Sequence, residues 1–133
     1  MAAAVSDYRP VFRDTQKIKK QAGHQDIVLE LTENPDILAE LGRRKKQQVI
    51  CGFAMETDNV LANAKRKLLE KKCDYLVLND LNDSDAGFQK DTNKVTVLSK
   101  AESIAFPVLS KEETAQAILK TLIGENTDEF TGR

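Results

Sequence analysis

Two near-continuous apolar runs limit the folds open to this chain. They are QQVICGFA at residues 47–54 and DYLVLNDL at residues 74–81, and both are typical of strands buried on two faces in a parallel sheet. The residues between them predict a helix from about Asp58 to Lys72, capped by Thr57. Strand, helix and strand in this order form a βαβ unit, so we expect parallel strands with helices on both faces.

Further segments extend the α/β pattern. In ENPDILAELGRRK, Asn34 suits the N-cap of a helix, Pro35 its first position and Gly42 the residue just past its end. KVTVLSK at 94–100 predicts a strand, and the S-x-x-E box at Ser110 predicts a last helix that stops near Gly124. We therefore predict an α/β fold with three layers and a mostly parallel sheet.

The segment before residue 33 predicts a hairpin. Ile27, Leu29 and Leu31 alternate with Val28, Glu30 and Thr32, as in a half-buried strand. Residues 17–20 could pair with it as a hairpin or flap, with the turn near Gly23. The opening AAAVSDYRP reads as the end of a strand without a leader, which indicates a piece cut from a longer protein.

Bulk properties exclude several classes of function. The 133 residues suit one domain, with 1–124 folded and 125–133 a frayed tail. A net charge of −1 and 5% aromatic residues argue against nucleic-acid binding. No apolar run approaches the ~20 residues that span a bilayer. Cys51 and Cys73 lack clustered histidines, so we expect reduced cysteines in a cytoplasmic protein rather than a zinc site.

Four features could hold an anion, and each has a plainer explanation. In TQKIKKQ, Lys17 and Lys19 share one face of an extended segment, or simply keep an edge strand soluble. The helix start at Asn34 offers backbone N–H groups, or is only a capped helix. On the helix at 58–72, the apolar arc is expected to comprise Val60, Leu61, Ala64 and Leu68. Lys71 falls within that arc and Lys67 at its edge; both either lean over the carboxyl ends of the strands, where ligands bind in such sheets, or snorkel past the core.

The fourth feature is the long polar loop from residue 82 to residue 93, which contains Gly87 and Phe88. Long loops in compact domains are often functional, although this one could be a plain surface excursion. No Ser/His/Asp or Cys/His nucleophile system is visible, and the single histidine, His24, is expected to be exposed and inert. Lysines and helix ends must therefore do any phosphate chemistry.

In their order, AAAVSDYRP, KIKK, NPDIL, GFAMET with AKRKLLEKK, LVLNDL and GFQKDTNKVTVL resemble the C-terminal part of bacterial phosphopantothenate–cysteine ligase. That ligase is the synthetase part of a bifunctional decarboxylase/synthetase. The resemblance implies a Rossmann-like fold, a β-hairpin flap that contributes to a homodimer, and a role in coenzyme A biosynthesis. It implies CTP, 4′-phosphopantothenate and cysteine as substrates, with Mg²⁺ sharing the triphosphate charge.

The resemblance also implies roles for individual residues. Ala2 and Ala3 would contact the base or sugar, and Asp7 would hold the ribose or the metal. Lys17 would be the catalytic, phosphate-side lysine of the flap. The remaining nucleotide contacts would come from the helix start, the edge of the sheet and the second helix, at Pro35, Asp36, Ile37, Leu38, Phe53, Lys67 and Lys71.

Two departures from the family pattern qualify this expectation. Met55 stands where the family usually has alanine, close to Phe53, and could alter the pocket. The family's N-terminal nucleotide-fold segment and the upstream FMN-dependent decarboxylase part have no counterpart in these residues. We therefore expect an incomplete synthetase domain that is inactive alone, and the alternative is a non-catalytic nucleotide-binding or dimerisation module.

Overall fold

The computed structural model describes residues 5–19, 27–56, 59–80 and 91–124. The chain divides into two compact units, Met1–Ile37 and Leu38–Arg133, which are described in turn. The predicted turn at Gly23, the Thr57 cap, the loop around Gly87 and the tail at 125–133 lie outside the described residues, as do Ala2 and Ala3.

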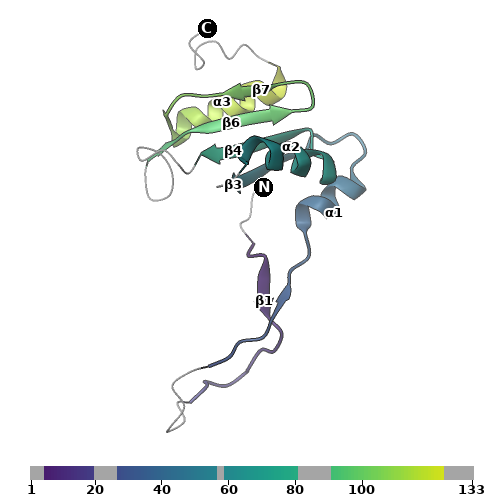
Figure 1. Cartoon of the computed structure of the whole chain (residues 1–133), viewed down its shortest axis with the longest axis vertical. Helices are drawn as coiled ribbons and strands as arrows, with labels where there is room; N and C mark the ends of the chain where they lie inside the picture. The colour runs from purple at the N-terminus through teal and green to yellow at the C-terminus, as the bar shows by residue number, and fades with distance from the viewer. Residues whose placement is uncertain (1–4, 20–26, 57–58, 81–90, 125–133) are drawn as a thin grey trace. The chain divides into compact units, whose positions relative to one another are not determined.

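The first unit contains a two-stranded antiparallel ribbon (Figure 1). β1 (Tyr8–Pro10) pairs with β2 (Leu31–Glu33), with Tyr8 opposite Glu33 and Pro10 opposite Leu31. The Val11 N–H extends the pairing by donating to the Glu30 carbonyl at 2.9 Å. A hairpin was predicted, but its described pairing involves residues 8–11 rather than 17–20.

The prediction that residues 27–32 form a half-buried strand is wrong about burial. Ile27, Val28 and Leu29 are all exposed, and Val28 retains 94% of its accessible surface. Period-two alternation describes a strand with one covered face, and neither face of this segment is covered. The apolar side chains of this arm therefore contribute no core.

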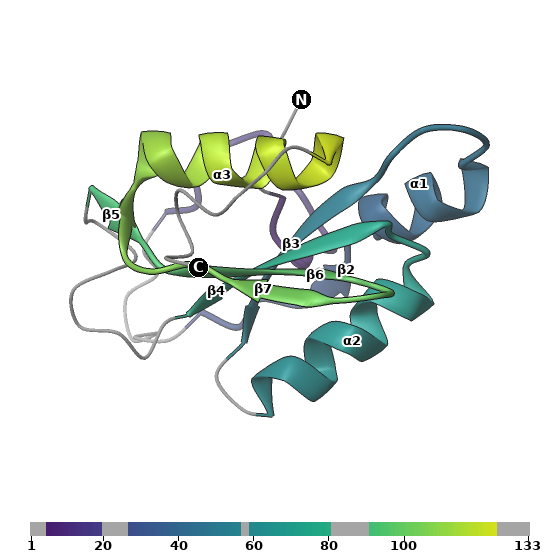
Figure 2. The ribbon, with the colours of Figure 1, turned by 90° about the horizontal axis from the view of Figure 1, so that it is seen from above.

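The second unit is built on a four-stranded sheet in the order β3-β4-β6-β7 (Figures 1 and 2). β3 (Cys51–Glu56) and β4 (Tyr75–Asp80) are parallel and joined by α2 (Val60–Glu70), which confirms the predicted βαβ unit. β6 (Val95–Ser99) and β7 (Ser103–Ala105) complete the sheet. Two short strands pair antiparallel outside this sheet: β5 (Thr92–Asn93), which precedes β6, and β8 (Leu109–Ser110), which follows β7.

The α/β, Rossmann-like prediction is confirmed, with one correction to strand direction. Only the β3–β4 pair is parallel among the described strands, whereas β4–β6 and β6–β7 are antiparallel. β6 and β7 are joined by the three residues 100–102, and a parallel connection needs a crossover of a dozen or more. The sheet is therefore mixed rather than mostly parallel.

Helices cover the sheet on two sides, giving the three predicted layers (Figure 2). On one side α2 buries Ala64 and Leu68 against Ala54, Leu76 and Leu78. On the other, α3 (Lys111–Ile123) buries Ala117 and Ile118 against Val77, Val95 and Val97. Strand residues alternate between these clusters because successive side chains point to opposite faces.

The ends of α3 are as predicted. The Ser110 side chain accepts a hydrogen bond from the Glu113 N–H at 3.2 Å, and the Glu113 carboxylate accepts one from the Ser110 N–H at 2.9 Å. This reciprocal capping box satisfies two otherwise unpaired donors. Gly124 ends the helix in the left-handed region at φ 77°.

The first helix, α1 (Ile37–Arg44), differs from its prediction at both ends. It begins at Ile37, so Asn34 is not its N-cap. Gly42 lies inside the helix rather than past its end, and it is buried. A Cβ at Gly42 would overlap the carbonyl oxygen of Lys71 and lie 3.3 Å from the Lys72 Cβ. The glycine therefore allows α1 to touch the end of α2.

Replacing Gly42 by alanine tests this contact. Alanine favours a helix by about 1 kcal/mol over glycine, but the overlap with backbone atoms costs about 2–3 kcal/mol, the upper part of the range for overpacking. We expect Gly42→Ala to lower the free energy of unfolding by about 1–2 kcal/mol in urea denaturation. Ala62→Gly, at an exposed site on α2, calibrates the helix-propensity term. An unchanged or raised midpoint for Gly42→Ala would contradict the close contact.

Candidate functional site

The predicted site residues divide between the two units. Asp7, Lys17, Pro35, Asp36 and Ile37 belong to the first unit. Those of the second unit are Leu38, Phe53, Lys67 and Lys71.

In the first unit, Asn34 ties the two arms of the hairpin together. Its side-chain amide donates to the Ser6 carbonyl at 2.6 Å and accepts from the Arg9 guanidinium at 2.9 Å. Its backbone N–H donates to the Asp7 carbonyl at 2.7 Å. The hydrogen-bonding groups of the Asn34 side chain and its backbone N–H are thus used within the hairpin. The backbone N–H of Asn34 was predicted to be available to an anion, but it is already bonded to Asp7.

This clamp brings two predicted ligand contacts together. The backbone carbonyl of Asp7 is hydrogen-bonded to the residue that precedes Pro35, so the backbone of Asp7 lies close to the segment that leads into α1. The side chains of Asp7, Pro35, Asp36 and Ile37 are all exposed. Lys17 is also exposed, in a segment without strand pairing. The contribution of Arg9, which also donates to the Glu33 carbonyl at 2.9 Å, was missed in the sequence.

In the second unit, α1 and α2 lie against the same face of β3. A Cβ on Gly52 would meet the Leu38 side chain at 2.7 Å, and Leu38 packs against the cluster that contains Ala64 and Leu68. Ile37 and Leu41 remain exposed, so only Leu38 of the predicted apolar face is used. Leu38 therefore packs on the side of the sheet that carries Lys67 and Lys71.

Lys67 and Lys71 are half-buried, one helical turn apart on α2, and both take part in polar or electrostatic interactions. Val60, Ala64 and Leu68 form the buried arc as predicted, but Leu61 is 52% exposed. The end of α2 leads directly into β4. Lys71 consequently lies near the amino ends of the strands, not near their carboxyl ends as expected.

Phe53 points to the other side of the sheet. Gly52 and Ala54 face α2, so the alternate residues Phe53 and Met55 face away from it. Both are more than half exposed. Because β3 is the edge of the described sheet, a ligand that contacts Phe53 together with Lys67 would have to lie along this edge.

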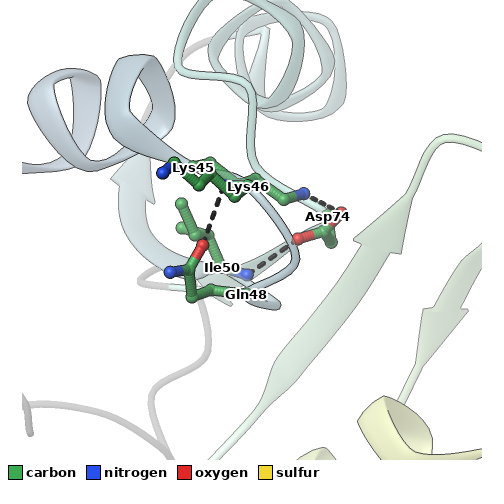
Figure 3. A network of polar contacts seen from close by, with 5 residues as sticks. All are labelled: Lys45, Lys46, Gln48, Ile50 and Asp74. Carbon is green, nitrogen blue, oxygen red and sulfur yellow. Dashed lines mark hydrogen bonds and ion pairs between the residues drawn. The ribbon is translucent and has the colours of Figure 1, made fainter.

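Asp74 organises the junction between α1, β3 and β4 (Figure 3). Its carboxylate is paired with the Lys45 ammonium group and accepts from the Ile50 N–H at 2.7 Å. Burial disfavours the charged form, but the hydrogen bonds from Lys45 and Ile50 outweigh it, so the pKa of Asp74 lies below its ordinary value. This link was also missed, since Lys45 and Asp74 lie 29 residues apart.

The two cysteines are poor nucleophiles. Burial, and the nearby Cys73, raise the pKa of Cys51 to about 11. Burial also raises the pKa of Cys73. Both thiols are free of disulfides, as predicted, and both stay protonated at neutral pH, whereas nucleophilic attack needs the thiolate.

A cavity of about 340 Å³ in the second unit is lined by none of the predicted site residues of that unit. It is lined by Val49, Asp74, Tyr75, Ser99, Lys100, Ala101 and Leu122, near the amino ends of β3 and β4. The Asp74 carboxylate is already bonded to Lys45 and Ile50, so we assign no ligand to this cavity.

In the described part of the chain, no group of three or more His, Cys, Asp or Glu residues could hold a metal ion. None of the described helices combines the length and the apolar character that a membrane span requires.

The sequence profile of the DNA/pantothenate metabolism flavoprotein C-terminal domain matches residues 1–125. The chain belongs to this family. The Coenzyme A biosynthesis bifunctional protein CoaBC of Bacillus subtilis is 40% identical over 121 residues, which are 90% of this chain and 29% of that protein. A Cysteine/Cysteine sulfinic acid decarboxylase from an unknown prokaryotic organism is 41% identical over 125 residues, 92% of this chain and 34% of that protein.

Two solved structures resemble the chain. The C-terminal domain of a CoaBC protein is 38% identical with a TM-score of 0.66, and the match covers 90% of this chain and 50% of the solved one. The DNA/pantothenate metabolism flavoprotein from Streptococcus pneumoniae is 21% identical with a TM-score of 0.67, covering 91% and 60%, and it supports the fold alone. The chain thus spans about a third of the two relatives and half or more of the solved structures.

The Asp74 junction makes a pH-dependent contribution to stability. Because its pKa is lowered in the folded state, the contribution is present above the unfolded value of about 4 and is lost as pH falls through the folded value. We expect Asp74→Asn to lower the free energy of unfolding at pH 7 by about 1 kcal/mol. In urea titrations, the difference from wild type should close as pH falls through the lowered folded-state pKa. Asp91→Asn, at an exposed site, is the matched control; an Asp74→Asn effect independent of pH would contradict the charge-based explanation.

Proposed function

We propose that this chain is the nucleotide-binding C-terminal part of a CTP-dependent phosphopantothenate–cysteine ligase in coenzyme A biosynthesis. The observation that carries the proposal is the Asn34 clamp, which holds Asp7 beside the start of α1. In the ligase that the sequence resembles, Asp7 and the start of α1 would both belong to the nucleotide site. The likeness to CoaBC proteins over nine-tenths of the chain supports the same function.

The proposed reaction has two steps. The carboxylate of 4′-phosphopantothenate attacks the α-phosphorus of CTP, which forms an acyl-cytidylate and releases pyrophosphate. The cysteine amine then attacks the acyl carbon, an amide forms, and CMP leaves. Charge develops on phosphate oxygens in both steps, so positioned cations and backbone donors supply most of the catalysis. Mg²⁺ would share the triphosphate charge, and Asp7 is the proposed ligand for it or for the ribose.

Within this proposal, Lys17 is the catalytic lysine that approaches the phosphates from the hairpin. Lys67 and Lys71 bind the nucleotide from α2, and their half-buried positions limit the entropy lost on binding. Ala2 and Ala3 keep their proposed contact with the base or sugar. The reaction also requires chain beyond these residues, so the 133-residue chain is proposed to bind nucleotide but to turn over little or no substrate alone.

Nucleotide titration followed by amide NMR tests the proposal. CTP with Mg²⁺ should shift the amide signals of Asp7, of Asn34 and residues 36–38, and of Lys67. Lys67→Gln should weaken binding roughly tenfold, since a charge-assisted contact is lost. Lys65→Gln removes an exposed lysine from the same helix and should leave the affinity unchanged. No shift at any of these positions would refute nucleotide binding by the chain.

A second proposed role is homodimerisation through the hairpin. The described hairpin exposes most of its large apolar side chains, including Phe12 at 80% and Val28 at 94%. The others are Val5, Tyr8, Val11, Ile18, Ile27, Leu29 and Leu31. Large exposed apolar patches mark interaction sites, and a second copy of the chain could bury these side chains by equivalent contacts on both subunits.

Sedimentation analysis over a range of concentrations tests the dimer. The wild-type chain should show a concentration-dependent dimer, and Phe12→Ser combined with Val28→Ser should shift it to monomer. Leu119→Ser, which removes an exposed leucine from α3, should not change the association. A wild-type chain that stays monomeric at the highest concentration would count against the hairpin as a dimer interface.

A further inference from the structure

The end of α1 and the end of α2 bring many cations into one region. Residues 40–46 and 71–74 contain six basic side chains and two carboxylates, in a chain whose net charge is −1. The two segments touch, because Gly42 lies against the backbone of Lys71 and the side chain of Lys72. The basic side chains are Arg43, Arg44, Lys45, Lys46, Lys71 and Lys72.

Two carboxylates neutralise part of this charge. Glu40 is the ion-pair partner of both Arg43 and Arg44, whose side chains are 70% and 77% exposed. Asp74 is used by Lys45. Lys46 and Lys72 are exposed and lie outside both helices. We call Arg43, Arg44, Lys46 and Lys72 the basic surface.

Helix stability explains only part of this arrangement. A helix C-terminus carries roughly half a negative charge, which one or two cations per helix would match. Here a glycine inside α1, a residue with low helix propensity, allows two positively charged helix ends to touch. Lys72 also adopts the left-handed conformation at φ 54°, which is unusual for a residue other than glycine. Several locally unfavourable features in one place, such as a glycine within a helix and a left-handed lysine, are typical of a functional site.

We propose that the basic surface binds oligophosphate chains. Arginine guanidinium groups match phosphate oxygens in a two-pronged geometry, and lysines add point charges. The surface offers two of each at adjoining helix ends. Such a ligand is either a free inorganic oligophosphate or the phosphate chain of a nucleotide or coenzyme. None of its four residues is among the proposed nucleotide contacts, although Lys72 directly follows Lys71, which is one of them.

The test uses the whole chain and inorganic tripolyphosphate at low ionic strength, followed by amide NMR. Signals of residues 43–46 and 72 should shift, and the affinity should fall as salt is added because exposed charges are screened. Lys46→Gln combined with Lys72→Gln should weaken binding roughly tenfold. Lys65→Gln combined with Lys111→Gln removes the same charge from exposed lysines elsewhere and should change the affinity less than about twofold.

Parallel titrations with CTP and with tripolyphosphate identify the source of the phosphate. Equal shifts at the basic surface with CTP and with tripolyphosphate would assign it to nucleotide-type chains, and shifts with tripolyphosphate alone would assign it to free chains. Three results would overturn the proposal: no shift at residues 43–46 and 72, equal weakening by the two double variants, or tighter binding of a pentaglutamate peptide than of tripolyphosphate. Shifts at Asp7, 36–38 and Lys67 report the nucleotide site separately, so the two proposals can fail independently.

Discussion

The parallel pairing of β3 with β4 is the interaction on which the second unit depends. The two strands pair without offset from Cys51 opposite Tyr75 to Glu56 opposite Asp80. Their alternating side chains supply both apolar clusters: Ala54, Leu76 and Leu78 face α2, while Cys51 and Val77 face the side covered by α3. A one-residue slip of β3 would exchange these faces and expose its core side chains. Within the second unit, β6 pairs with β4, and α2 and α3 cover the two faces of the sheet.

Local sequence patterns predicted the elements whose structure is determined by residues close together in the sequence. The apolar runs of β3 and β4 and the capping box of α3 are read from consecutive residues, and the structure has them where expected. The predictions failed where a distant partner decides the outcome. Asn34 has the chemistry of an N-cap, but its amide is used by Ser6 and Arg9, some 25 residues earlier. Gly42 resembles a helix stop, yet its small size serves a contact with Lys71.

The candidate site was only partly accessible to sequence reasoning for the same reason. Residue types and spacing singled out Lys67, Lys71 and the start of α1, but could not indicate that Phe53 points to the sheet face opposite α2. The face is set by register and by which side α2 covers, both of which depend on the complete sheet. The Lys45–Asp74 pair carried no local signal at all, although it closes the junction between α1 and β4.

The position of the Asn34 clamp has a consequence for how the hairpin can vary. The described hydrogen bonds tie the hairpin at its base, where Ser6, Asp7 and Arg9 meet Glu33 and Asn34. The geometry at that base does not depend on the number of residues between the two arms. Insertions or deletions between residues 11 and 30 would therefore leave the spacing between Asp7 and the start of α1 unchanged. The length of the hairpin can diverge among related proteins while its anchor stays the same.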